Sequence, residues 1–219
     1  MKISKIRFTI KKECTVLSWF SKILILIVLA SLIYLLFCQL PLHLSKCNPV
    51  KGDLLVIDGN MPDYALEQAV LIFNNYNYKK IVATGGDFHS GHYVSGKKSM
   101  PELTRATLIK LGLDSLNIAT IECGAVFRNR TQTSAKKLGQ WISEKEIPVQ
   151  HVDVLTIGCH AKRSQLLFQK ALGQQYTVGV WAIPDKTYDI DKWWKTSKGA
   201  RTVISEIIAY FYTRFFLFV

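Results

Sequence analysis

The sequence of 219 residues predicts an α/β fold: a three-layer domain with a mainly parallel five-stranded sheet, preceded by one N-terminal transmembrane helix. Five short apolar runs rich in β-branched residues alternate along the chain with segments whose apolar residues have helical spacing. These runs contain few polar positions, which is typical of strands covered by helices on both faces. One uncharged apolar segment of bilayer-crossing length lies ahead of them.

The apolar N-terminal segment is residues 23–40, which carry no charged side chain. A membrane-spanning helix needs about 20 predominantly apolar residues, with a lower limit of about 17. A cleaved signal peptide is the competing interpretation, but the bulky residues at 35–38 (LLFC) offer no small-residue cleavage site. A buried core helix is disfavoured by the length of the run and by its lack of a polar face. We therefore predict an uncleaved anchor.

Basic residues ahead of this anchor outnumber those directly after it. Lys46 and Lys51 follow the anchor, and six basic residues precede it: Lys2, Lys5, Arg7, Lys11, Lys12 and Lys22. Because positive charge stays on the cytoplasmic side, we predict a single-pass protein with its N-terminus in the cytoplasm and its domain outside. The predicted divisions are a cytoplasmic N-terminus (1–22), the anchor (23–40), a linker (41–52) and the α/β domain (53–219).

The expected elements follow one another in alternation. Strands are predicted at residues 53–57, 81–84, 118–122, 152–157 and 176–182. Helices are predicted at residues 62–76, from 101 to a stop at Gly112, at 133–144, after the fourth strand, and at 199–216. Right-handed crossovers between parallel strands place such helices on both faces of the sheet.

Polar or glycine-rich residues follow four of the five predicted strands. They are Asp58 after the first, Gly85 and Gly86 after the second, Arg128, Arg130 and Thr131 after the third, and His160 with Arg163 after the fourth. The carboxyl ends of parallel strands meet at one edge, where helix N-termini present unpaired N–H groups and partial positive charge. An imidazole and guanidinium groups at that edge favour an anionic ligand.

The glycines and the loop arginines each have a structural alternative. Gly85 and Gly86 permit a backbone nest that binds an anion, or they form a plain turn. Arg128 and Arg130 can hold phosphate or carboxylate with forked donors, or they lie in solvent.

The groups with acid–base chemistry have structural alternatives as well. His160 can titrate near neutral pH, or it caps the following helix while Arg163 is a solvated helix residue. Glu102, at a predicted helix start, complements the helix dipole or serves as a general base.

Charge and cysteine content narrow the classes of partner. Part of the net charge of +12 comes from the basic residues before the anchor and is explained by topology, and the remainder suits anionic lipid headgroups or a phosphorylated substrate. The domain lacks a basic run interleaved with aromatic residues that would indicate nucleic acid. The five cysteines are irregularly spaced without a CxxC pair, so free thiols are expected. His89 and His92 have no third ligand nearby in the sequence, so no metal site is predicted.

Several of these motifs together resemble the bacterial envelope family typified by SanA, ElyC and YdcF, over residues 53 to about 211. The matching features are the strand DLLVIDG at 53–59, the run Thr84-Gly85-Gly86, Glu102, the segment RTQTSA at 130–135, the pair His160 and Arg163, Trp193-Trp194 and Glu206. Arg130 stands where the family usually has Asn, and Thr133 with Ser134 replace the usual Glu-Asn. These departures leave a change of ligand or a loss of activity open.

The resemblance implies a Rossmann-like domain, often anchored in the bacterial inner or plasma membrane and associated with envelope biogenesis. It also implies polyprenyl-phosphate or peptidoglycan precursor metabolism. We therefore expect a membrane-anchored envelope protein that binds or acts on a phosphorylated ligand at the strand-end edge. The sequence names no cofactor and no oligomeric state.

An enzyme of this kind would perform phosphoryl transfer or hydrolysis. His160 would be the acid or base, Glu102 or Asp58 would orient it or a water, and the loop at 88–99 would close over the site. The alternatives are a non-catalytic module for an anion or a partner protein, and a binder of a nucleotide-like cofactor.

The last predicted helix ends in an aromatic run, residues 210–218, that is too short to span a bilayer. It either packs on the sheet or rests at the membrane interface, where amphipathic rings are favoured.

Overall fold

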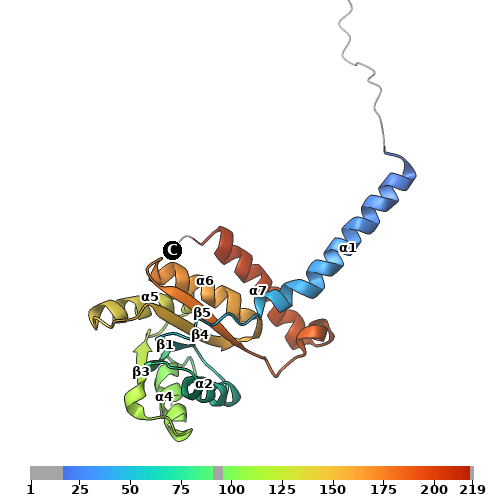
Figure 1. Cartoon of the computed structure of the whole chain (residues 1–219). Coiled ribbons are helices and arrows are strands. Elements are labelled where there is room, and N and C mark those ends of the chain that lie inside the picture. The colour runs from blue at the N-terminus through green and yellow to red at the C-terminus, as the bar shows by residue number, and fades with distance from the viewer. Residues whose placement is uncertain (1–16, 91–95, 218–219) are drawn as a thin grey trace, which may run out of the picture. The chain divides into compact units, whose positions relative to one another are not determined.

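The computed structural model describes residues 17–90 and 96–217 (Figure 1). The chain divides into two compact units, Met1–Cys38 and Gln39–Val219. The basic residues predicted to lie in the cytoplasm are outside the described residues, except Lys22. His92 and part of the loop at 88–99 are outside them too.

Helix α1, Trp19–Leu44, is long and apolar enough to cross a membrane. It contains the predicted anchor, residues 23–40, and is longer at both ends, with Pro41 inside it. Its large apolar side chains between Ile23 and Leu36 are exposed, so the protein itself does not cover them. The first residues of the predicted linker, 41–44, are helical.

Five parallel strands form one sheet in the order β3-β2-β1-β4-β5. The strands are β1 (Leu54–Asp58), β2 (Lys80–Gly85), β3 (Ile118–Glu122), β4 (His151–Ile157) and β5 (Thr177–Ile183). The chain builds outward from β1 to β3 and then crosses back to β4 on the other side of β1. The predicted Rossmann-like α/β fold is therefore confirmed. The direction in which successive strands are added to the sheet reverses between β1 and β4.

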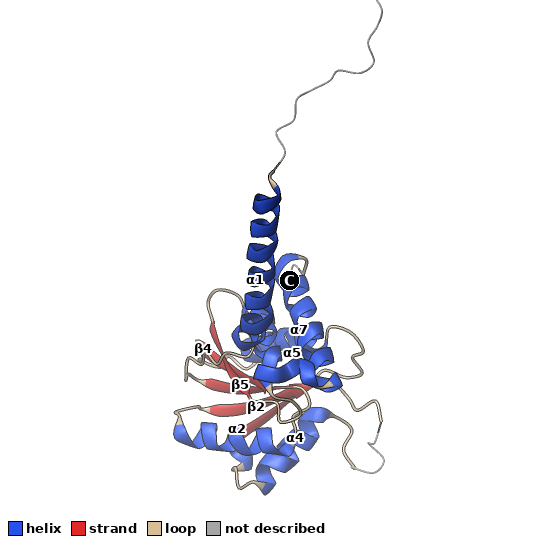
Figure 2. Cartoon of the chain, turned by 90° about the vertical axis from the view of Figure 1, so that its right-hand side faces the viewer, coloured by secondary structure: helices blue, strands red, loops and turns tan. Residues whose placement is uncertain are grey.

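Helices cover both faces of the sheet (Figure 2). Helices α2 (Asp63–Asn75) and α4 (Met100–Lys110) join the core cluster of Leu55 and Ile57, whereas α5 (Arg130–Glu144) and α6 (Ala161–Leu172) join that of Leu54 and Val56. These alternate residues of β1 point to opposite faces because successive side chains of a strand do so. Burial on both faces explains why β1 is continuously apolar.

Helix α7, Ser197–Phe215, packs against α6 and follows the short helix η3, Ile190–Lys195. The end of α1 belongs to the same unit, because Leu44 is fully buried in a cluster with Val203 of α7 and Trp193 of η3. The first residues of the predicted linker are therefore fixed to α7.

A buried carboxylate fixes the linker to the sheet. Asp153 of β4 is fully buried and accepts hydrogen bonds from the backbone N–H groups of Val50 and Lys51 at 2.8 and 2.6 Å, and from the Tyr78 hydroxyl at 2.6 Å. Burying a charge is costly unless such donors surround it. These bonds hold the end of the linker against the sheet.

Helix α5 begins at Arg130, three residues before the predicted start at 133. The first turn of α5 is polar and lacks apolar periodicity, so the spacing of apolar residues indicated only the later turns. Asn129 precedes it in the left-handed region, with φ 52°. The boundary prediction was wrong here, and Arg130 and Thr131 belong to the first turn of a helix rather than to a loop.

Candidate functional site

A cleft of about 630 Å³ lies at the carboxyl edge of the sheet. Its lining includes Asp58 and Gly85 at strand ends, Arg130 and His160 at helix starts, and Glu206 of α7. In open parallel sheets ligands bind at this edge where the strand order reverses, which here is between β1 and β4. The cleft is in the usual size range of small-molecule sites.

His160 lies between two carboxylates. Its Nε2 atom is 3.5 Å from Oδ2 of Asp58 and 3.4 Å from the Thr131 hydroxyl. Its Nδ1 atom is 3.1 Å from Oε1 of Glu206. Strand β1, helix α5 and helix α7 thus all meet at one imidazole ring.

The surroundings of His160 raise its pKa to about 9. Burial disfavours the imidazolium, but the hydrogen bonds to Asp58 and Glu206 outweigh it, and Arg163 opposes them only in part. Burial raises the pKa of Glu206, but its hydrogen bonds with His160 and Arg163 outweigh burial and hold that pKa well below its usual range. At neutral pH the ring is therefore a cation between two acidic side chains.

Arg163 is committed to Glu206. Its Nε donates to Oε2 at 2.9 Å and its Nη2 to Oε1 at 3.1 Å, a forked pairing that orients both side chains. Asp58 is held in turn by the Ser164 hydroxyl, which donates to it at 2.9 Å. Arg163 therefore positions the carboxylate that faces His160, instead of being free to grip a ligand as expected.

The structure brings most of the predicted site residues together. The residues from that prediction that line the cleft are Asp58, Gly85, Gly86, Arg130, Thr131, His160 and Arg163. Four strand ends far apart in the sequence meet as the fold class requires.

Glu102 and Arg128 do not line the cleft. Glu102 accepts a hydrogen bond from the Lys98 N–H at 2.8 Å, while its own N–H donates to the Ser99 hydroxyl at 3.4 Å. This is a capping arrangement at the start of α4, and the backbone donor holds the pKa of Glu102 below its usual value. Its position supports the helix-start interpretation and not a role as base, and Arg128 is an exposed loop residue.

The two glycines serve close packing. Gly85 has φ 156°, and its carbonyl accepts from the Cys123 N–H at 2.8 Å. A Cβ on Gly86 would stand 2.9 Å from the carbonyl oxygen of Gly124, closer than real contacts allow. The Asp87 N–H, which an anion nest would use, donates to that same carbonyl. The nest interpretation of Gly85-Gly86 is therefore weakened, although both glycines line the cleft.

Three helices open at the cleft without a side-chain cap. None of α2, α5 and α6 has a side-chain capping hydrogen bond, whereas Ser99 caps α4 and Thr196 caps α7. The first N–H of α6, that of Ala161, donates to the Gly158 carbonyl. Met61, Asn129 and His160 of the cleft lining stand at or next to those three starts. Uncapped N–H groups and the helix dipole favour a negatively charged ligand group.

The cleft is mixed in charge. Its acidic residues are Asp58, Asp87, Asp185 and Glu206, and its basic ones are Arg130, Arg163, Lys198 and His160. Among the described residues, Arg130 and Lys198 form no ion pair. These two cations are therefore the ones available to an incoming anion.

Sequence reasoning missed Glu206, Lys198 and Asp185 as members of the site. The first two lie on α7, which η3 separates from the end of β5, and Glu206 had been noted in the sequence only as part of the family resemblance, without a role in the site. Among the described residues, no group of three or more His, Cys, Asp or Glu side chains is arranged to hold a metal ion. His89 lines the cleft and stacks on Phe127 at 4.8 Å.

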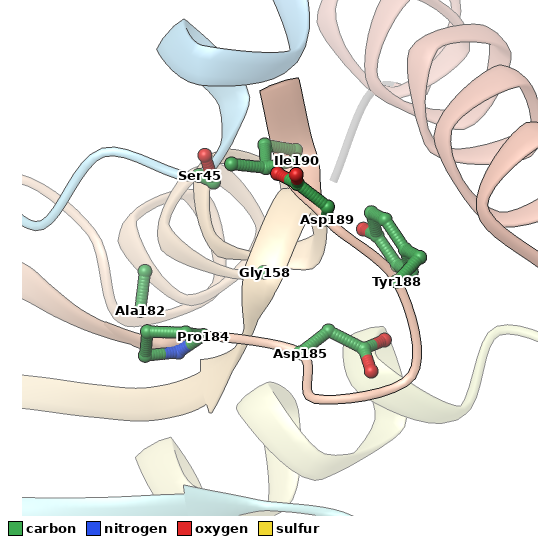
Figure 3. Close-up of a pocket in the computed structure, with 8 residues that line it drawn as sticks. All are labelled: Ser45, Gly158, Ala182, Pro184, Asp185, Tyr188, Asp189 and Ile190. Atoms are coloured by element: carbon green, nitrogen blue, oxygen red, sulfur yellow. The ribbon is translucent and has the colours of Figure 1, made fainter. Parts of the chain in front are cut away.

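A second pocket of about 310 Å³ adjoins the cleft, and Asp185 lines both. Figure 3 shows Asp185, Tyr188 and Asp189 on the loop after β5, Ile190 at the start of η3, and Ser45 from the segment after α1. Cys159 lies near this pocket as a fully buried thiol whose pKa is raised to about 11 by burial. Such a thiol is inert, so it is not a candidate nucleophile.

A comparison of the sequence with models of known protein families gives no matching family, and a comparison with curated proteins gives no significant match. The function must therefore be argued from the geometry of the cleft.

Proposed function

We propose that the protein is a membrane-anchored envelope-biogenesis protein of the SanA, ElyC and YdcF type that binds or acts on a phosphorylated ligand in the His160 cleft. The ligand class is a polyprenyl phosphate or a peptidoglycan precursor. The observation that carries this proposal is a cationic imidazole at the reversal point of the sheet. It lies beside helix starts without a side-chain cap and two cations, Arg130 and Lys198, that form no ion pair among the described residues.

The anchor supports a lipid-borne ligand. A helix able to cross a bilayer precedes the domain, so the cleft would remain near the membrane. The basic residues before the anchor favour a cytoplasmic N-terminus and an extracytoplasmic domain.

A catalytic role would use His160 as a general acid. With a pKa of about 9, the ring carries the proton at neutral pH and can pass it from Nε2 to a leaving oxygen. Asp58, 3.5 Å from Nε2, would orient the ring or a water. Arg130 and Lys198 would neutralise phosphate oxygens, which is the main requirement of phosphoryl transfer.

One observation favours a binding module without chemistry. Arg163 pairs with both oxygens of Glu206, Glu206 lies 3.1 Å from Nδ1 of His160, and the buried Cys159 is not activated. On this alternative the cleft retains a phosphorylated ligand and releases it unchanged.

Ligand capture tests the proposal. The full chain is purified in detergent, and lipids that co-purify are identified by mass spectrometry for wild type, Arg130→Ala and Arg128→Ala. We expect a phosphorylated lipid on wild type and Arg128→Ala, and a loss of about tenfold or more on Arg130→Ala, since a hydrogen bond to a charged group is worth about 1.5–3 kcal/mol. Equal retention of the lipid by all three proteins would show that the ligand does not bind in this cleft.

Turnover of the captured ligand then separates the two candidates. Phosphate release by wild type that is lost in His160→Gln while binding persists identifies an enzyme. Binding without release in wild type identifies the module.

A further inference from the structure

A third pocket, of about 300 Å³, lies between the end of α1, helix α6 and helix α7. Its lining includes the basic residues His43, Lys162 and Arg214, accompanied by Gln165 and Tyr210. It shares no lining residue with the His160 cleft.

The lining of this pocket contains basic side chains and no Asp or Glu. In the part of the chain that the structure describes, His43, Lys162 and Arg214 form no ion pair. Lys162 donates to Oε1 of Gln165 at 3.2 Å, and burial together with the positive charge of Lys46 lowers its pKa. Lys162 and Arg214 have no carboxylate beside them in this lining, so an anion would stabilise their positive charges.

The pocket includes a residue near the end of α1. His43 stands three residues after Leu40, the end of the uncharged segment 23–40. Leu40 and Leu44 lie in one cluster with Val203, Ile207 and Tyr210 of α7. If the segment 23–40 crosses a bilayer, the chain leaves the bilayer near Leu40. The part of α7 that packs on Leu40 and Leu44 then lies within about one helical turn of that point.

Helix α7 also has an uncovered apolar stripe. Ile204, Ile208, Phe211 and Phe215 are 49%, 64%, 42% and 62% exposed, and their spacing places them on one face of the helix. Phe211 lies four residues after Ile207 and three before Arg214, so it adjoins both on the helix surface. Basic and apolar side chains at one boundary are characteristic of interfacial helices.

We propose that this face of α7 rests on the membrane surface and that the pocket of His43, Lys162 and Arg214 holds the phosphate of an anionic phospholipid headgroup. The apolar stripe of α7 beside the pocket favours a lipid over a free phosphate, because its exposed apolar side chains would be buried against acyl chains. This inference rests on α1 being the anchor of the proposed function, but not on the ligand of the His160 cleft.

Photo-crosslinking tests the membrane contact. A photoreactive amino acid replaces Leu29, Ile208 or Leu116 in the full chain, which is placed in lipid nanodiscs containing phosphatidylglycerol. Leu29 reports on the anchor, and Leu116, 77% exposed before β3, is the matched control for an exposed apolar residue. We expect lipid adducts at Leu29 and Ile208 but not at Leu116.

The pattern of adducts separates the two ideas. Adducts at Leu29 without adducts at Ile208 overturn the interfacial α7 while leaving the anchor intact. The absence of adducts at Leu29 overturns the anchor and this inference together.

Headgroup selectivity tests the pocket. We expect phosphatidylglycerol, and not phosphatidylcholine, to be retained on the full chain in native mass spectrometry. Arg214→Ala and Lys162→Ala should each reduce that retention about fivefold, whereas Arg201→Ala, an exposed cation of α7 outside the pocket, should leave it within about twofold. Equal retention of both lipids, equal losses in all three variants, or displacement of the lipid by excess inorganic phosphate would each overturn the proposal.

Discussion

The charge state of His160 depends on a carboxylate contributed by a distant helix. Glu206 approaches Nδ1 at 3.1 Å, and Arg163 holds it there. Glu206→Gln removes a negative charge that favours the imidazolium, so the pKa of His160 should fall from about 9 by about one unit or more. Titration of the His160 ring followed by NMR measures this shift.

Glu102→Gln is the matched control, because it removes a carboxylate of the same type from the start of α4, away from the cleft. It should leave the His160 titration unchanged. An unaltered pKa in Glu206→Gln would show that this pair does not control the ring.

The raised pKa of His160 also makes stability depend on pH. The ring binds its proton more tightly in the folded state, with a pKa of about 9, than in the unfolded state, with about 6.5. Its contribution is therefore complete below pH 6.5 and is lost as pH rises through 9, by at most about 3 kcal/mol. Urea unfolding of wild type and His160→Gln between those pH values should give a steeper decline for wild type; parallel curves would contradict the assignment.

Among the elements, α4 depends on its first turn. The Ser99 hydroxyl accepts from the Glu102 N–H and donates to Glu122 at 3.2 Å, and Ser99 is fully buried. Ser99→Ala should lower the free energy of unfolding by about 1–2 kcal/mol without changing ligand capture. Ser205→Ala on the exposed side of α7 is the control and should cost about 0.5 kcal/mol or less.

Most elements could be predicted from the sequence because burial on both faces leaves a clear apolar signature. The five strands lie within one or two residues of their predicted positions. The start of α5 could not be placed, because its first turn carries polar residues that serve the cleft and not the core. Glu102 was ambiguous for a related reason: a carboxylate in a first turn has the same sequence pattern whether it caps or catalyses.

The whole site combines what sequence order reveals with what only packing reveals. Strand ends of a parallel sheet must converge, so Asp58, Gly85, Arg130 and His160 could be expected at one edge. The contact of Glu206 with His160 could not be expected, although the family resemblance included Glu206, because α7 is placed by its packing on α6 and not by strand order. The pairing of Arg163 with Glu206 could not be predicted for the same reason.

Orientation in the membrane is a prediction for the whole chain. If the domain lies outside the cytoplasm, Leu116→Cys in intact cells should react with a membrane-impermeant thiol reagent, and Lys5→Cys should be protected. The native cysteines are first replaced by serine, since Cys47 is exposed. Protection of position 116 with reaction at position 5 would reverse the topology.

The central claim is that the His160 cleft binds a phosphorylated lipid. The most direct measurement is the dissociation constant of a short polyprenyl phosphate for the full chain in nanodiscs, compared among wild type, Arg130→Ala and Arg128→Ala, with the corresponding polyprenol as the uncharged ligand. From the proposed function we expect tight binding of the phosphate alone, weakened about tenfold or more by Arg130→Ala, at a residue that lines the cleft, and unchanged by Arg128→Ala. Equal affinity for the phosphate and the alcohol, or equal affinity in the two arginine variants, would contradict it.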